Sequence, residues 1–117
     1  MAIPLDLAAE VEQLHQQESW RKGDHTAKTL IKQPDLRVVV TALRQGGRIE
    51  EHRAPGRITI QTLTGRLRLH AHDKDIDLPA GHVVVLDLGD AHDVEALDES
   101  AFLLTIVWSA QAQQAAE

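Results

Sequence analysis

From Leu36 to Trp108 the sequence consists of short apolar-rich stretches separated by turns, and this pattern restricts the chain to a β-fold. The stretches "RITIQTLT" and "RLRLHAH" alternate apolar and polar side chains, as strands with one buried face do. Gly65 lies between them, so we expect these two strands to form a hairpin. The last stretch, "AFLLTIVW", is nearly all apolar and is predicted to be a strand buried on both faces. Many short strands with regular turns are typical of a sandwich or a closed barrel.

The first 35 residues show a different periodicity. Leu7, Val11 and Leu14 recur at helical spacing after a helix-capping Asp6, which predicts a helix over residues 7–17. Its apolar stripe would pack on the barrel or on a partner. A charged segment with one short strand near residues 26–31 follows. The chain is therefore predicted to contain an N-terminal helix and arm (1–35), a β-barrel (36–110) and a flexible tail (111–117).

Composition excludes several classes of function. The 117 residues suit one domain, and the formal charge of -6 disfavours binding to a nucleic-acid backbone. There is no Cys, which rules out disulfides, thiolate nucleophiles and Cys-ligated zinc, and which fits a reducing cytoplasm. No apolar run is long enough for a signal peptide or a membrane span. We therefore expect a cytoplasmic protein without nucleic-acid or membrane partners.

Two glycine-bounded segments of the β-region each place a histidine at a defined spacing. Gly46 and Gly65 enclose His52, and a second glycine-led segment contains His92. Both segments resemble the motifs of the cupin family, G-x5-H-x-H-x3,4-E-x6-G and G-x5-P-x-G-x2-H-x3-N, with matching spacing throughout. Four glycines and two histidines match. The positions that depart from the motifs are Ala54, Ile58, Asp87 and Ala96.

The resemblance spans most of the chain and implies a fold. Cupins are small jelly-roll barrels, also described as double-stranded β-helices, so we expect an all-β barrel of this kind with a short N-terminal helix. By the same resemblance, His52 and His92 would project into one mouth of the barrel, and the protein would form a homodimer. The family hosts enzymes, sensors, storage proteins and binding modules, so the fold alone does not select an activity.

The departures from the motifs affect the metal site that many cupins carry. Such cupins typically hold a divalent metal with three histidines and one glutamate. Here Ala54 and Ile58 occupy two of these positions, which leaves His52 and His92 as the candidate ligands. Imidazole suits Fe, Mn, Ni or Zn, with water or a substrate completing the shell. Side chains that could lend a further oxygen are Glu50, Glu51 and Gln61.

The sequence leaves three functions open. The first is a small-molecule-binding protein with a largely apolar barrel pocket and a polar end. The second is a metal-dependent enzyme of the dioxygenase or isomerase type that uses the two motif histidines as ligands. The third is a sensory or regulatory module that contacts a partner through its N-terminal helix. The predicted pocket residues are His52, Ala54, Ile58, Ile60 and His92.

Other polar residues are given structural interpretations. His70 and His72 alternate with apolar residues on one predicted strand and are assigned to a solvated face, with a metal-ligand pair as the alternative. The acidic stretch 73–77 is predicted to be a solvated turn. Arg53 and Arg57 would lie near the barrel mouth, where they could meet an anionic ligand or water.

Overall fold

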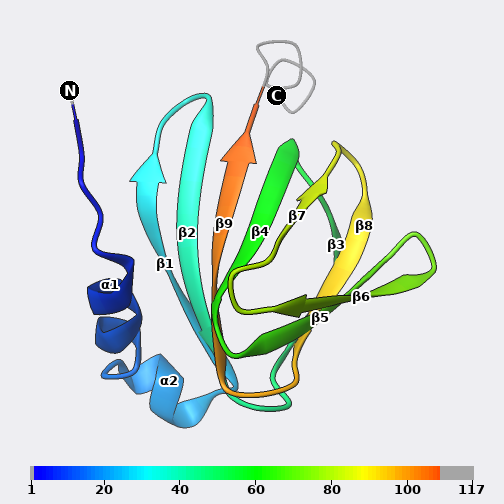
Figure 1. Cartoon of the computed structure of the whole chain (residues 1–117). Coiled ribbons are helices and arrows are strands. Elements are labelled where there is room, and N and C mark those ends of the chain that lie inside the picture. Colours follow the sequence, from blue (N-terminus) through cyan, green and yellow to red (C-terminus); the bar gives the residue numbers. More distant parts are fainter. Residues whose placement is uncertain (1, 109–117) are drawn as a thin grey trace.

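The computed structural model describes residues 2–108, and these fold into two packed antiparallel sheets (Figure 1). One sheet has five strands in the order β1-β2-β9-β4-β7, and the other has four in the order β3-β8-β5-β6. The strands are β1 His25–Lys32, β2 Leu36–Leu43, β3 Arg48–Arg53, β4 Arg57–Thr64, β5 Arg66–Ala71, β6 Lys74–Pro79, β7 Val83–Leu86, β8 Ala91–Ala96 and β9 Ser100–Val107. The predicted all-β jelly roll is confirmed.

The main core lies between the two sheets because each sheet turns its apolar face inward. Ile58 and Ile60 of β4 and Leu67 and Leu69 of β5 are all 2% exposed or less. Their neighbours along each strand are polar and point outward, as the alternation in the sequence predicted. Burial of these aliphatic side chains is the dominant stabilising contribution in a chain with so few aromatic residues.

The predicted hairpin around Gly65 is wrong. β4 pairs with β7 and β9, whereas β5 pairs with β6 and β8, so the two strands belong to different sheets. Gly65 instead turns the chain from one sheet to the other, with a φ of +80°. The Arg66 amide that follows donates to the Ser100 hydroxyl at 3.0 Å, which ties the corner to the start of β9.

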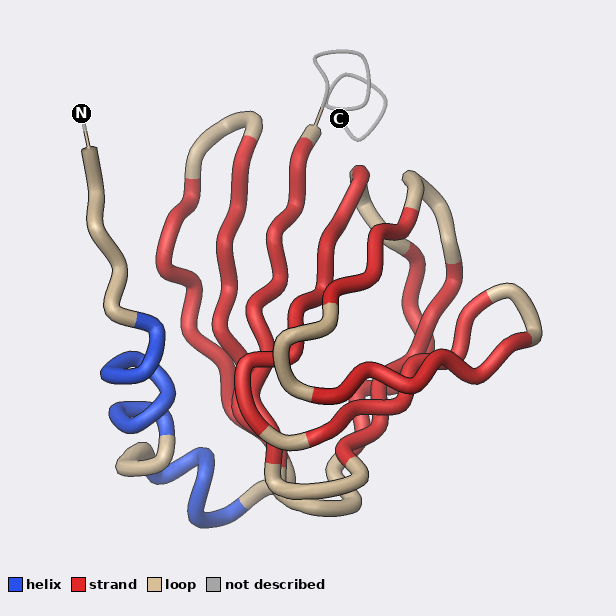
Figure 2. Tube along the Cα trace, viewed as in Figure 1, coloured by secondary structure: helices blue, strands red, loops and turns tan. Residues whose placement is uncertain are grey.

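The helices lie at the N-terminal end of the chain, against the outer face of the five-stranded sheet (Figures 1 and 2). α1 (Leu7–Leu14) is capped by Asp6, whose carboxylate accepts from the Ala9 amide at 3.1 Å. It is shorter than predicted, and a second helix, α2 (Glu18–Lys22), forms where irregular chain was expected. The predicted strand near residues 26–31 is present as β1, at the edge of the sheet.

The helices supply a second, smaller core. Leu14 and Trp20 pack against Val40 and Ala42 of β2, with Leu103 of β9 partly buried beside them. β9 is therefore covered on both faces at this end. At its other end Val107 is 50% exposed, so the predicted burial of this strand on both faces applies only to part of it.

Parts of the prediction lie beyond the described residues. The expected flexible tail (111–117), and residues 109–110 of the expected barrel, fall outside residues 2–108. Within the described part of the chain, no helix is long and apolar enough to cross a membrane.

Candidate functional site

The two motif histidines meet across neighbouring strands. His52 of β3 and His92 of β8 are direct Cα partners in the four-stranded sheet. Their rings are in edge contact, with centroids 4.2 Å apart and planes inclined by 61°. His92 is only 2% exposed, whereas His52 is exposed and lies on the edge strand. The pair thus offers one buried and one accessible imidazole.

Backbone contacts determine which nitrogen of each ring carries the proton. His52 Nδ1 lies 3.1 Å from the Glu50 carbonyl oxygen, and His92 Nδ1 lies 3.2 Å from the Asp90 carbonyl oxygen. A carbonyl oxygen can only accept a hydrogen bond, so each Nδ1 must donate. In the neutral rings the proton is therefore on Nδ1, and Nε2 keeps a lone pair. Each Nε2 can thus accept a hydrogen bond or bind a metal.

Burial sets the charge of the inner ring. Desolvation lowers the pKa of His92, because a charged imidazolium loses water's stabilisation there. The hydrogen bond to the Asp90 carbonyl opposes this effect, and the neighbouring His52 reinforces it. His92 is consequently neutral at neutral pH and can act as an acceptor.

The other predicted pocket residues are core side chains. Ala54, Ile58 and Ile60 are each 2% exposed and belong to the main core between the sheets. Ile58 and Ile60 share the inward face of β4, as their spacing predicted. Their predicted position in the barrel interior is confirmed, whereas their predicted role as pocket residues stays a prediction.

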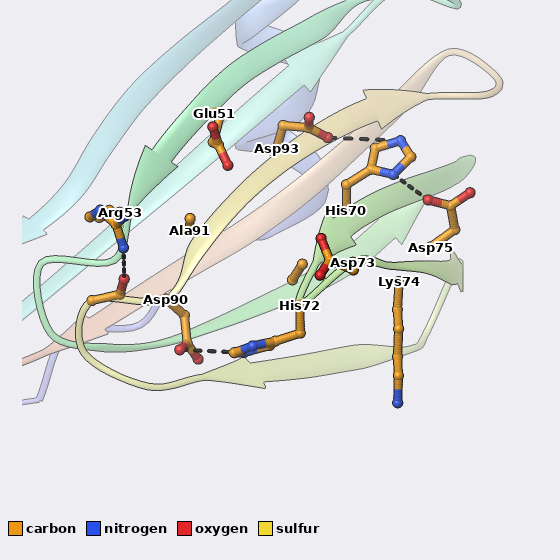
Figure 3. A pocket seen from close by; sticks show the side chains of 12 residues that line it. Glu51, Arg53, His70, His72, Asp73, Lys74, Asp75, Asp90, Ala91 and Asp93 are labelled. Atoms are coloured by element: carbon orange, nitrogen blue, oxygen red, sulfur yellow. Dashed lines mark hydrogen bonds and ion pairs between the residues drawn. The ribbon is translucent and has the colours of Figure 1, made fainter.

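A polar hollow of about 620 Å³ lies elsewhere, on the outer side of the four-stranded sheet (Figure 3). Three segments build it: β3, the β5–β6 hairpin, and the β7–β8 turn with the start of β8. Its titratable wall residues are Glu51, Arg53, His70, His72, Asp73, Lys74, Asp75, Asp90 and Asp93. Sequence analysis did not identify this hollow, because its walls meet only through strand pairing.

His70 and His72 lie in this hollow, in different settings. His70 is on β5 and faces two carboxylates: its Nδ1 pairs with Asp75, and its Nε2 is 3.9 Å from Asp93. His72 is not on the strand at all. It occupies the β5–β6 turn with a φ of 55°, and its Nε2 is 3.3 Å from Asp90. The alternation that grouped the two histidines on one face therefore ends before His72.

Comparison with known proteins identifies the fold. No family model matches the sequence, and no curated protein does. Among solved structures, a cupin superfamily protein from Desulfitobacterium hafniense matches with a TM-score of 0.76 at 17% identity, over 93% of this chain and 94% of that one. The fold is that of a small single-domain cupin. A cupin-2 domain protein from Shewanella frigidimarina matches with a TM-score of 0.70 at 14% identity, over 88% and 93%.

One further neighbour of this cupin barrel is more similar in sequence. It is a conserved protein of unknown function from Streptococcus pyogenes, with a TM-score of 0.74 and 26% identity over 93% of this chain and 90% of that one. These likenesses support the cupin resemblance seen in the motifs and leave the activity to be argued from the site itself.

The barrel offers few metal-binding groups at the positions of the cupin motifs. Ala54 and Ile58, at the positions of the motif's second histidine and glutamate, carry no donor atom. Gln61 pairs with Val83 of β7 through the backbone. Its side chain is exposed, on the face of β4 opposite to the side chain of Ile58. Glu51 faces the outer hollow. In residues 2–108, no group of three or more His, Asp or Glu side chains is placed to hold a metal ion.

The two arginines near this end of the cupin barrel are exposed and already have partners. Arg53 Nη1 donates to the Gly89 carbonyl oxygen at 3.0 Å, and Arg57 Nε lies 3.3 Å from Asp87. Their contacts tie β3 and β4 to the β7–β8 turn. Solvation and turn stabilisation account for both residues.

Proposed function

We propose that this cupin is a small-molecule-binding protein whose ligand is recognised by His52 and His92. The observation that carries the proposal is the contact between the two imidazole rings, whose Nδ1 atoms face backbone carbonyl oxygens and so leave each Nε2 as a hydrogen-bond acceptor. A ligand with two hydroxyl or amide donors matches two neighbouring acceptors. A few convergent polar groups are typical of sites that recognise small molecules.

The burial of the two rings suggests how a ligand would approach. His52 is exposed on the edge strand and would be met first, whereas His92 lies behind it at 2% exposure. Because burial keeps His92 neutral, it accepts a hydrogen bond without attracting a counter-ion. The proposal therefore favours neutral ligands with hydroxyl or amide groups over strongly charged ones.

Ligand-observed NMR with a library of small alcohols, phenols and amides tests this function. We expect some of these compounds to bind, so that their NMR signals broaden in the presence of the wild type. The same compounds should shift the imidazole signals of His52 and His92. A His52→Ala, His92→Ala double variant should lose these hits, and a His82→Ala variant, altered at an exposed histidine outside the pair, should keep them. Hits that persist in the double variant would contradict the proposal.

The second candidate is a metal-dependent cupin enzyme with His52 and His92 as ligands. What favours it is that a ring whose Nδ1–H donates to a carbonyl is oriented as metal-ligating histidines are. Fe, Mn, Ni or Zn bound there would supply Lewis-acid chemistry. The two histidines would hold it, and water or substrate would have to fill the positions left by Ala54 and Ile58. The described residues thus fit a metal only in part, which places this function second.

Metal content distinguishes the two functions. The protein would be purified without an affinity tag, incubated with each metal salt, desalted and measured by mass spectrometry beside the double histidine variant. Binding without metal supports the first function. Near-stoichiometric metal in the wild type that is lost in the double variant would establish the second function instead.

A further inference from the structure

We propose that Arg37 is a further recognition residue, which binds a single carboxylate on the ligand that His52 and His92 recognise. This role rests on the proposed function and deepens it, because it assigns the ligand to small acids that also carry a hydroxyl or amide donor. Arg37 is partly exposed, near the start of β2, and is the strand partner of Ile106 of β9. Ile106 belongs to the core between the sheets, and strand partners point to the same face, so Arg37 points to the barrel interior.

The two histidines face the same interior from the other sheet. Along β8, His92 shares its side of the strand with Val94, which is buried in the core. His52 is the strand partner of His92, so its side chain leaves the sheet on the same side. Arg37 and the histidine pair therefore project from opposite sheets into the space between them.

Arg37 also lies at the same end of the barrel as the histidine pair. Strand register places Arg37, Ile106 and Ile58 at one level across the five-stranded sheet. β3 ends one residue after His52 and β4 begins one residue before Ile58, so the turn at residues 54–56 keeps both at this end. Sheets that pack face to face lie about 10 Å apart, so one small molecule can contact residues of both.

The guanidinium of Arg37 has no anion to pair with in the described part of the chain. Within residues 2–108, no Asp or Glu oxygen lies within 4.0 Å of its nitrogens. Its Nε is buried and has no hydrogen-bond partner there. An unmatched donor of a charged group is costly to bury, so a bound acceptor would stabilise this side chain. A carboxylate offers two oxygens in one plane, which match the N–H donors along one edge of a guanidinium.

Trp108 holds the guanidinium of Arg37 in place. Arg37 Cζ lies 5.2 Å from the centroid of the Trp108 ring, and this ring is partly buried against the core. A ring stacked on one face of the planar group leaves the edge donors to partners in its plane. The stacking also reduces the conformational entropy that the side chain loses when a ligand binds.

The two recognition groups require different parts of a ligand. Because His92 is neutral, the histidine pair accepts hydrogen bonds from uncharged hydroxyl or amide donors. The guanidinium of Arg37 is charged and is matched by one carboxylate, which leaves the bound ligand balanced in charge. A second carboxylate on the ligand would be unpaired beside the neutral His92. The arrangement therefore favours monocarboxylates with a distant hydroxyl or amide group.

NMR titration with matched acids and amides tests the role of Arg37. The probes are 4-hydroxybutyrate, 4-hydroxyphenylacetate and the primary amide of each, which keeps the hydroxyl and replaces the carboxylate by a neutral group. We expect at least one acid to bind about tenfold more tightly than its amide, because hydrogen bonds between charged groups are the stronger ones. The Nε–H signal of Arg37, assigned by its loss in Arg37→Met, should shift with the acid and not with the amide.

A matched variant separates this site from general attraction between a cation and an acid. Arg37→Met should weaken the acid about tenfold and leave the amide within about twofold. Arg57→Met removes the same charge at an exposed arginine of the same end, and should leave both compounds within about twofold. Thermal unfolding checks that each variant folds. Equal weakening of the acid by the two variants would overturn the role of Arg37.

The outcomes distinguish this role from the proposed function. Amides that bind through the histidine pair, with acids that bind no better, would refute the role of Arg37 and leave the proposed function standing. Acid binding that needs Arg37 and survives the His52→Ala, His92→Ala change would support the carboxylate site and contradict the function of the histidines. If none of the four probes binds, the role of Arg37 is overturned, and the library screen still decides the proposed function.

Discussion

His52 and His92 are Cα partners across β3 and β8, and their rings touch edge to face with centroids 4.2 Å apart. The contact joins an exposed edge strand to a buried position beside the core. Since each Nδ1 donates to a carbonyl of its own strand or of the adjoining turn, the two Nε2 atoms are the reactive ends of the pair. The proposed ligand site depends on this relationship.

The burial of His92 predicts a pH dependence of stability. Its pKa is lowered in the folded state, so below about pH 6.5, the ordinary value for histidine, the unfolded chain binds more protons than the folded one. Stability should therefore fall as pH falls through that value. Urea unfolding at pH 7.5 and pH 5.5 measures the loss, which should be smaller in a His92→Gln variant. An equal or larger loss of stability in that variant would show that His92 is not the cause of the pH dependence.

Restoring the missing donors should create a metal site. An Ala54→His, Ile58→Glu variant would place four motif ligands around the barrel mouth. Without metal it should be destabilised by about 3 kcal/mol, because Ile58 is 2% exposed and a carboxylate there is unpaired. Zn²⁺ or Ni²⁺ should recover stability, measured as a rise in Tm of several degrees. The single variant Ile58→Glu should regain less stability when the metal is added. Absence of any metal-dependent rise would show that the mouth geometry differs from the motif's.

Gly65 should be far more sensitive to substitution than Gly46. Both have positive φ, +80° and +84°. A Cβ on Gly65 would collide with the Glu99 carbonyl oxygen and with Ser100, whereas nothing lies within 4 Å of one on Gly46. Gly46→Ala should cost about 1 kcal/mol of unfolding free energy and Gly65→Ala at least about 3 kcal/mol. Urea unfolding measures both, and similar losses would refute the collision as the cause.

Replacing the residues of the β5–β6 turn should raise the stability of the protein. Its two central residues, His72 and Asp73, have φ values of 55° and 58°, a left-handed conformation that Gly adopts without the steric cost of a Cβ. Positive φ at both positions is typical of a type I′ hairpin turn, for which Asn-Gly is preferred. Replacing the pair by Asn-Gly should raise the unfolding free energy by roughly 1 kcal/mol. Unchanged or lower stability would show that the pair contributes contacts that offset its backbone cost.

The homodimer expected from the cupin resemblance remains a prediction. The structure offers exposed apolar side chains for it: Val83 and Val85 on edge strand β7 are 55% and 58% exposed, and Val107 on β9, on the other side of β4, is 50% exposed. If a second copy covers this face, Val85→Asp should give monomers in light scattering after size exclusion, while Val11→Asp should not. A wild type that is monomeric at about 100 µM would exclude this interface, because interfaces of standard size have micromolar or tighter affinities. A Val85→Asp variant that stays dimeric would exclude it as well.

Local patterns in the sequence determined the inward faces of strands, the position of a helix and the meeting of the two motif histidines. Period-two alternation placed Ile58 and Ile60 on the inward face, since neighbouring side chains of a strand must point to opposite sides. Helical spacing and a capping Asp6 located α1. The motif spacing brought His52 and His92 together, because it encodes the separation of two positions in a known barrel. Each of these inferences needs only neighbouring residues or a motif.

Strand partners were decided by tertiary structure alone. Gly65 looked like a hairpin turn, and in the fold it is the corner between two sheets, because β4 pairs with β7 and β9 whereas β5 pairs with β6 and β8. His72 looked like a strand residue and lies in a turn. The hollow around Asp93 exists only because β3, β8 and β5 are neighbours. Pairing depends on which distant apolar faces bury each other, and that information is not local to any stretch of the chain.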